Sequence, residues 1–401
     1  MIAYRVFSAF PNAAFAYLVV RTTPLAIAST ILVAVSAIPI FQLLDFGEVT
    51  AASEMLSKPD FGTDSMLVAV RLMRIQSILL VFGLSAVALL RMLGLASKFQ
   101  LQGSFLAVVF VSCSISTAAA VFERRLVMRR KYGQLVLCAA PSCLLIVLCL
   151  LANLLFSVRF SLFALGSILG CSIFLPRLLA IFTEVHPVRL LRVAFSGSWN
   201  APKTRRLSKA AARGFLALQV IGLVSFQTDV VVAKLIGSDS SAVRLALLGR
   251  AFGPVLLVGS ALAQDIWPRI LSDCASTDAA RRMCIRVLLV TGVLSVGAAG
   301  IAQVLNLSLP VRSQLGWSDL AAGILWFPML SFGTAIGQVL AARGQIRLLV
   351  RRGWAMAGSN LLLTIVFGHL YGPPGFLLAS FVSYGVLIVG PSWHLTGENG
   401  Q

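Results

Sequence analysis

Runs of about 20 consecutive apolar residues recur along the whole chain, and they limit its possible folds more than any other sequence feature. A helix of that length crosses the hydrocarbon core of a bilayer, which is about 30 Å thick. Apolar residues make up 58% of the 401 positions and charged residues only 12%, whereas soluble domains hold about 25% charged residues. We therefore predict an all-α polytopic membrane protein.

Turn residues and charge clusters divide these runs into twelve predicted membrane helices. A basic connection at 183–212, which contains Pro187, Gly197 and Pro202, separates the first six from the last six. We predict an N-terminal six-helix lobe at 1–182, a cytoplasmic linker at 183–212 and a C-terminal six-helix lobe at 213–401, with a central cavity between the lobes. The predicted spans are 4–20, 24–44, 66–90, 105–122, 133–156, 161–182, 213–236, 242–268, 281–307, 319–342, one that ends near Tyr371 and one that ends near Val389.

The distribution of Lys and Arg predicts the orientation in the membrane. With twelve crossings, 25 of the 33 basic residues fall on the side of the N-terminus, six on the opposite side and two within spans. Lys and Arg accumulate in cytoplasmic loops, so we predict that both termini are cytoplasmic. This topology, together with contacts to anionic lipid at the cytoplasmic face, explains most of the net charge of +19.

Several function classes lack support in the sequence. The basic clusters have no interleaved aromatic residues, so nucleic acid is not an expected partner. The seven cysteines form no C-x-x-C pair and the three histidines are scattered, so we expect no metal site and no cofactor. No phosphate-binding loop, nucleophile elbow or paired carboxylates in a large loop are present. We predict a transporter rather than an enzyme.

Two ionisable residues in the hairpin at 216–269 are the main candidates for a functional site. Asp229 precedes the turn at 236–241 by about as many residues as Arg250 follows it. On two antiparallel helices both residues lie at the same depth, roughly 10 Å below one membrane face. Ionisable groups at that depth face a partner or a water-filled cavity. Two interpretations remain open: a substrate site, or a buried ion pair that only sets the register of the two helices.

Further basic residues extend this hypothesis. Lys234 and Arg244 flank the same hairpin, so cations outnumber Asp229 by three to one and favour an anionic substrate. Lys234 is also explained as a residue that reaches to the membrane rim. Arg71 and Arg74, at i and i+3 near the cytoplasmic end of the third span, either line the cavity or contact lipid head groups. The candidate substrate-binding residues are Arg250, Asp229, Lys234, Arg71 and Arg74.

Four short motifs resemble those of the polysaccharide-unit (Wzx-type) flippases in the superfamily of MATE-like exporters. Leu43-Leu44-Asp45-Phe46-Gly47 is similar to the Leu-Asp-Leu-Gly end of their second helix. The segment 227–237, with an Asp before an aliphatic run and a Gly, resembles their seventh helix. The segment 244–250 resembles their eighth helix, although Arg244 stands in place of the usual Tyr. Trp267-Pro268-Arg269 is similar to the Leu-Pro-Arg end of that helix.

This resemblance implies a fold of two six-helix lobes around a central cavity. It also implies alternating access in a bacterial inner membrane, which moves an undecaprenyl-pyrophosphate-linked oligosaccharide from the cytoplasmic to the periplasmic leaflet for exopolysaccharide, O-antigen or capsule biosynthesis. The partners it implies are the lipid-linked oligosaccharide and the polysaccharide polymerase machinery. In such a family cationic cavity residues receive the diphosphate or sugar, which on matching positions means Arg250 with Asp229 as its partner.

Three alternatives remain from the sequence. A drug or metabolite exporter of the same fold is expected to expose acidic residues to cationic substrates. A membrane glycan polymerase or ligase is expected to have a long periplasmic loop, whereas the longest connection here is basic. The third alternative is an assembly scaffold that transports nothing.

Overall fold

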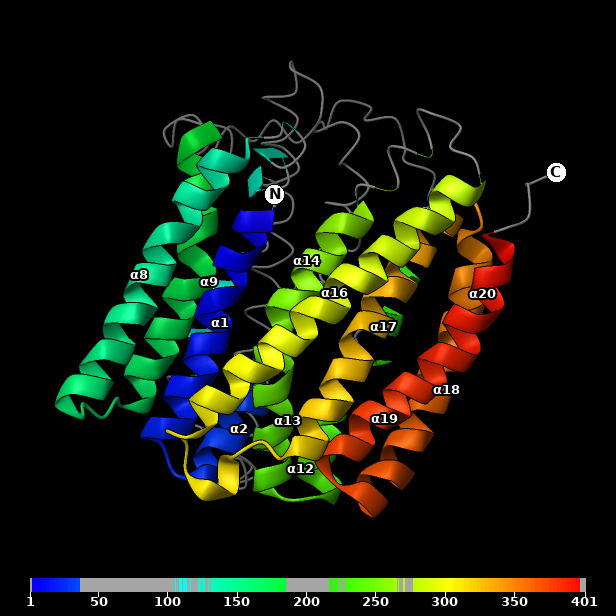
Figure 1. Cartoon of the computed structure of the whole chain (residues 1–401). Helices are drawn as coiled ribbons and strands as arrows, with labels where there is room; N and C mark the ends of the chain where they lie inside the picture. Colours follow the sequence, from blue (N-terminus) through cyan, green and yellow to red (C-terminus); the bar gives the residue numbers. More distant parts are fainter. Residues whose placement is uncertain are drawn as a thin grey trace, which may run out of the picture.

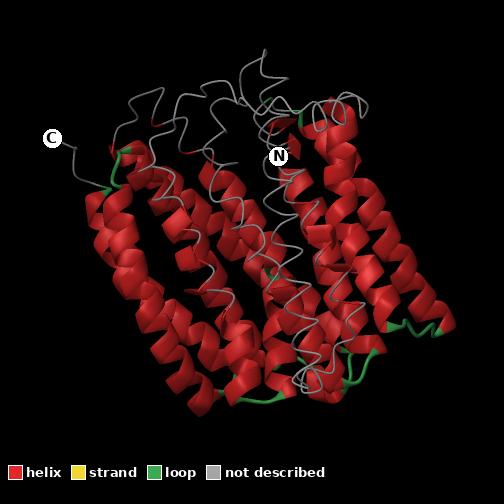
Figure 2. Cartoon of the chain, turned by 180° about the vertical axis from the view of Figure 1, so that it is seen from behind, coloured by secondary structure: helices red, strands yellow, loops and turns green. Residues whose placement is uncertain are grey.

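The computed structural model describes residues 2–36, 131–184, 228–264 and 277–396, with single positions and short stretches within 105–129, 216–225 and 266–270. These residues form helices and short connections, and their long helices run nearly side by side (Figures 1 and 2). Six helices in the described part are long and apolar enough to cross a membrane, and a bent pair is a possible seventh span. The predicted all-α polytopic membrane fold is confirmed, while the count of twelve spans stays a prediction.

The N-terminal part of the bundle consists of α1 (Ile2–Thr22), α2 (Leu25–Ser36), α8 (Tyr132–Phe156) and α9 (Leu162–Glu184). Helix α1 packs against α8 and α9, which form a hairpin at one edge of the molecule (Figure 1). The bounds of α8 and α9 match the fifth and sixth predicted spans to within two residues. Helix α8 continues through Pro141 and α1 through Pro11.

The C-terminal part begins with α12 (Thr228–Ile236), α13 (Asp239–Ala251) and α14 (Gly253–Gln264). The long helices α16 (Thr277–Asn306), α17 (Trp317–Ala342) and α18 (Ile346–Tyr371) follow. The last span is α19 (Pro373–Tyr384), a π-helical turn at Gly385–Val389, and α20 (Gly390–Leu395). These helices match the predicted ninth to twelfth spans, with the final one ending six residues later than the predicted Val389.

The predicted eighth span, 242–268, is broken rather than straight. Helices α13 and α14 meet at Phe252 with a bend of 43°. Pro254 has no N–H for the carbonyl of Arg250, so the helical hydrogen-bond pattern is interrupted at that turn. The Phe252 ring is fully buried and stacks on Phe327 of α17, with ring centroids 4.8 Å apart. The bend therefore combines a local backbone cause with a tertiary contact.

The N-terminal helices contact the C-terminal helices mainly through α12, α13 and α14. Helix α1 packs on α13 and α14, and α2 packs on α12 and α13. The larger of the two apolar clusters in the described part includes Phe15, Phe105, Phe252 and Phe376. The predicted lobe boundaries at 182 and 213 are not tested, because 185–215 lies outside the described residues.

Candidate functional site

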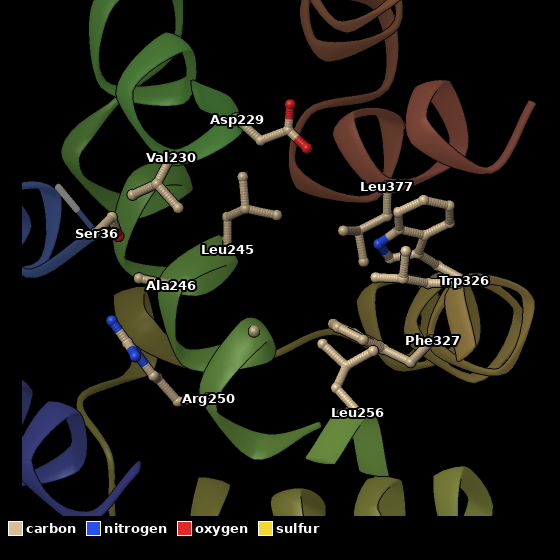
Figure 3. A pocket seen from close by; sticks show the side chains of 12 residues that line it. Ser36, Asp229, Val230, Leu245, Ala246, Arg250, Leu256, Trp326, Phe327 and Leu377 are labelled. Atoms are coloured by element: carbon tan, nitrogen blue, oxygen red, sulfur yellow. The ribbon is translucent and has the colours of Figure 1, made fainter. Parts of the chain in front are cut away.

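A central cavity of about 140 Å³ lies where α2, α12, α13, α14, α17 and α19 converge. Asp229 from α12 and Arg250 from α13 both line it, so the hairpin brings the two predicted residues to one place (Figure 3). Their equal distance from the turn between α12 and α13 explains this meeting. The other lining residues are apolar or small: Ser36, Val230, Leu245, Ala246, Gly249, Leu256, Trp326, Phe327, Leu330 and Leu377.

Arg250 lies in the last turn of α13, directly before the bend at Phe252. A cation is favoured there, because the C-terminal end of a helix carries partial negative charge. Its guanidinium points toward the side of the cavity where the N-terminal helices lie (Figure 3). The described residues supply it with no ion pair or hydrogen bond. Arg250 is thus a half-buried cation at the cavity wall.

Asp229 points the other way, toward α18 and α19 (Figure 3). The residue is only 5% exposed. One carboxylate oxygen accepts a hydrogen bond from Thr364 Oγ1 at 3.2 Å, and the other accepts one from Ser380 Oγ at 3.1 Å. Two neutral donors therefore hold a buried acidic group where the predicted partner was a guanidinium.

Asp229 and Arg250 do not form an ion pair with each other, although their equal depth on the two helices would allow one. The side chains share a cavity but point to opposite sides of it (Figure 3). Depth is a matter of residue counting, whereas direction depends on how each helix is rotated against its neighbours. This arrangement argues against a pair whose only role is to set the helix register. It leaves each charge available for a separate task.

The hydroxyl groups around Asp229 belong to a larger polar cluster inside the C-terminal helices. Asn360 of α18 donates from Nδ2 to the carbonyl of Ser225 at 2.8 Å, and Ser383 of α19 donates to Asn360 Oδ1 at 3.0 Å. The sequence predicts interhelical hydrogen bonds for Asn360 and for three other single polar residues within helices, Gln303, Asn306 and Gln338. The polar cluster could have been predicted from the spacing of Asn360 and Thr364 at i and i+4, because this spacing places both side chains on one face of the helix.

Lys234 lies outside the cavity, at the end of the bundle away from both termini. Its Nζ pairs with Asp239 and donates to Ser29 Oγ of α2 at 2.7 Å. Ser29 in turn donates to Asp239 Oδ1 at 2.7 Å. The predicted substrate role of Lys234 therefore has no support from its position. These contacts instead link the α12–α13 turn to the N-terminal helices.

Arg244 is also neutralised, which changes the predicted charge balance. Its guanidinium pairs with Asp319 at the start of α17, with Nε 3.0 Å from Oδ2. The same oxygen accepts the N–H of Gly316 at 2.7 Å and so caps α17. With Lys234 and Arg244 paired elsewhere, one cation, Arg250, and one acid, Asp229, line the described cavity. The predicted three-to-one excess of cations is wrong at this site. Arg71 and Arg74 lie outside the described residues.

No protein-family model and no curated protein sequence matches the chain, but solved structures do. One is an inward-facing multidrug resistance MATE family transporter of the MOP superfamily, with a TM-score of 0.65, 12% identity, and coverage of 97% of this chain and 94% of the other. Another is the lipid II flippase MurJ in an inward closed conformation, with a TM-score of 0.63, 14% identity, and coverage of 98% and 86%. A third is the Vibrio cholerae MATE transporter VcmN, with a TM-score of 0.56, 15% identity, and coverage of 98% and 96%. The chain therefore has the fold that these MATE transporters share with MurJ.

Proposed function

We propose that this protein is a flippase that moves an undecaprenyl-pyrophosphate-linked oligosaccharide across the bacterial inner membrane by alternating access. The observation that carries the proposal is the position of Arg250, a cation at the wall of a central cavity with no partner among the described residues. A membrane protein keeps such a group at its centre only when an anion or water meets it there. The shared fold with MurJ, which is named a lipid II flippase, supports the same class of substrate.

Guanidinium chemistry suits a diphosphate. Arg presents donors in a planar fork that bonds two phosphate oxygens at once, and it stays charged when water is excluded. The cavity of about 140 Å³ is smaller than the roughly 300–1,000 Å³ of typical ligand sites. An oligosaccharide therefore passes only when the helices on the two sides of the cavity separate. Arg250 stands at the break between α13 and α14, where such a movement changes its surroundings directly.

Asp229 is assigned the coupling step in this proposal. A buried carboxylate held by two hydroxyl groups suits a proton or a monovalent cation. Binding of that ion neutralises Asp229 and changes the hydrogen bonds from Thr364 and Ser380, which belong to α18 and α19. The ion gradient thereby biases the packing of three helices next to the cavity.

The predicted topology is part of the proposal. Twelve spans with both termini in the cytoplasm, the lobes at 1–182 and 213–401 and the linker at 183–212 follow from the charge distribution. Anionic lipid at the cytoplasmic face and the polysaccharide polymerase machinery are the proposed further partners. In this orientation the Lys234, Asp239 and Ser29 contacts lie at the periplasmic end.

A drug exporter of the same fold is the second candidate. Trp326 and Phe327 line the cavity together with Asp229, and aromatic rings beside a carboxylate attract organic cations. The likeness to multidrug MATE transporters agrees with this reading at the level of the fold. The two candidates differ in which charge the substrate contacts: Arg250 for the flippase and Asp229 for the drug exporter.

The test compares Arg250→Ala and Arg250→Lys in a strain whose surface polysaccharide depends on this protein. We expect Arg250→Ala to abolish polymer export, because the bidentate contact to the diphosphate is lost, and Arg250→Lys to retain a minor fraction. The measurement is surface polymer per cell at equal membrane levels of the protein. Arg159→Ala removes an exposed arginine from the α8–α9 loop and serves as the matched control.

Unchanged polymer export in Arg250→Ala would remove this residue from the site. Loss of drug resistance in Asp229→Asn, with polymer export intact, would favour the drug exporter.

A further inference from the structure

A second hollow lies on the outer surface of the C-terminal helices. It has a volume of about 570 Å³ and lies between α16, α17, α19 and the π-helical turn. Every lining residue is apolar, including Leu289, Val293 and Val296 of α16 and Met329 of α17. The three α16 side chains are 63%, 75% and 60% exposed. Side chains this exposed and this apolar in a membrane-spanning helix face lipid chains.

This groove is separate from the central cavity. Helix α17 stands between them and presents Trp326 and Phe327 to the cavity, while Leu325, Pro328 and Met329 line the groove. A molecule whose head group occupies the cavity therefore does not reach the groove without passing α17. The groove is therefore not a continuation of the central cavity.

Two arginines continue the groove toward the N-terminal end of α16. Arg282 and Arg286 are exposed and precede Leu289, Val293 and Val296 at helical spacing, so all five lie on one face of α16. At 1.5 Å per residue, Arg286 lies about 4.5 Å and Arg282 about 10 Å from Leu289 along the axis. Neither arginine forms a hydrogen bond or ion pair within the described part of the chain.

The neighbouring Arg281 differs from these two residues because it makes contacts within the bundle. Its guanidinium lies 5.3 Å from the centre of the Trp393 ring of α20, and its Nε donates to Thr396 Oγ1 at 3.4 Å. The Trp393 ring packs at 5.3 Å against Phe332, which lines the groove. Arg281 is thus held by contacts within the bundle, whereas Arg282 and Arg286 are exposed.

We propose that this face binds one anionic phospholipid, with a fatty acyl chain in the groove and its phosphate between Arg282 and Arg286. Charge complementarity selects the head group, and the apolar lining accepts the chain. The reach fits a lipid of the leaflet at the N-terminal end of α16, because its chain descends from the head group toward the middle of the bilayer, where the groove lies. The inference does not rest on the proposed flippase activity.

The test measures lipid bound to the purified full chain by native mass spectrometry after addition of phosphatidylglycerol or phosphatidylethanolamine. We expect the unmodified protein to retain phosphatidylglycerol in preference to phosphatidylethanolamine. The double variant Arg282→Gln/Arg286→Gln removes two charges worth about 1 kcal/mol each near a lipid surface. It should weaken phosphatidylglycerol binding by about tenfold or more and abolish the preference.

A second variant fills the groove. A Cβ on Gly292 meets no atom within 4 Å, so Gly292→Leu fits the fold and occupies the space of the chain. It should lower the binding of both lipids. The matched controls are Gly297→Leu, on the same helix outside the groove, and Arg347→Gln/Arg351→Gln, which removes two exposed arginines at the same end of the bundle.

Three results would overturn the proposal. Equal losses in the two double-arginine variants would show diffuse attraction to charge rather than a site. Equal retention of both lipids by the unmodified protein would remove the role of Arg282 and Arg286. A polyprenyl phosphate that copurifies and resists displacement by phosphatidylglycerol would assign the groove to the substrate chain.

Discussion

Asp229 is a buried acidic residue that joins three of the C-terminal helices through hydrogen bonds. Its carboxylate is held by hydroxyl donors from α18 and α19 and has no basic partner among the described residues. An ionised group in such surroundings is costly unless a proton or cation compensates it. The residue is therefore suited to alternate between two charge states, with the hydroxyl groups of Thr364 and Ser380 following each change.

Asp229→Asn tests this role. The amide has nearly the same shape as the carboxylate and keeps one oxygen acceptor, so we expect the protein to fold and to remain in the membrane. Because the amide does not ionise, transport should lose its dependence on the driving ion gradient. The measurement is the transfer of the lipid-linked oligosaccharide from one leaflet of a vesicle membrane to the other, with and without an imposed ion gradient.

Ser380→Ala is the comparison for Asp229→Asn. It removes one hydrogen bond, worth about 1 kcal/mol, and should lower the rate without removing the gradient dependence. A gradient response in Asp229→Asn equal to that of the unmodified protein would contradict the assignment.

At the scale of elements, the break between α13 and α14 is the feature that places the site. Pro254 removes a backbone hydrogen bond, and Phe252 fills the space beside α17. Gly323 of α17 makes that packing possible, because a Cβ there would lie 2.8 Å from Phe252 Cε2. The last span has a comparable contact: Tyr384, directly before the π-helical turn, packs on Gly333, where a Cβ would lie 2.2 Å from its ring.

Gly323→Ala should destabilise the protein, although Gly to Ala in a helix ordinarily stabilises by about 1 kcal/mol. The added methyl group collides with a fully buried ring that is stacked on Phe327, and overpacking of this kind costs about 1–3 kcal/mol. Thermal unfolding in detergent measures the difference.

Gly337→Ala on the same helix provides the control, since a Cβ there meets no atom within 4 Å. It should leave the melting temperature unchanged or raise it. The double variant Gly323→Ala/Phe252→Leu should recover part of the loss. Equal melting temperatures for the two single variants would show that Phe252 moves freely and does not hold the bend.

At the scale of the whole molecule, polar contacts join the N-terminal and C-terminal helices at the end away from both termini. Ser29 of α2 bonds Lys234 and Asp239 of the α12–α13 hairpin, and Tyr17 of α1 bonds Ser308 beyond α16. In an alternating-access cycle these bonds must break when the cavity opens to that side.

Asp239→Asn should shift the population toward the state open at this end. Hydrogen bonds to charged groups contribute about 1.5–3 kcal/mol, so we expect an increase of about tenfold or more in the open population. A cysteine at Ala246, which lines the cavity, reports the shift through its rate of labelling by a membrane-impermeant maleimide.

Ser238→Ala serves as the control for Asp239→Asn. It removes the N-cap of α13 in the same turn without touching α2, and should leave the labelling rate nearly unchanged. Equal acceleration in both variants would indicate local fraying of the turn rather than separation of the two groups of helices.

The sequence by itself determined the membrane class, the bounds of most described helices and the common depth of Asp229 and Arg250. These depend on properties that act along the chain: the length of apolar runs, turn chemistry, and the rise of 1.5 Å per residue that sets depth. Counting residues from one turn was enough to bring Asp229 and Arg250 to the same cavity.

Only the tertiary structure decided where those side chains point and what they contact. The rotation of each helix depends on packing partners distant in sequence, which is why Asp229 meets Thr364 and Ser380 rather than Arg250. The pairing of Lys234 with Asp239, and of Arg244 with Asp319, likewise joins residues whose charges looked free in the sequence. Side-chain direction and charge neutralisation arise from contacts between helices, and no periodicity within a single helix encodes them.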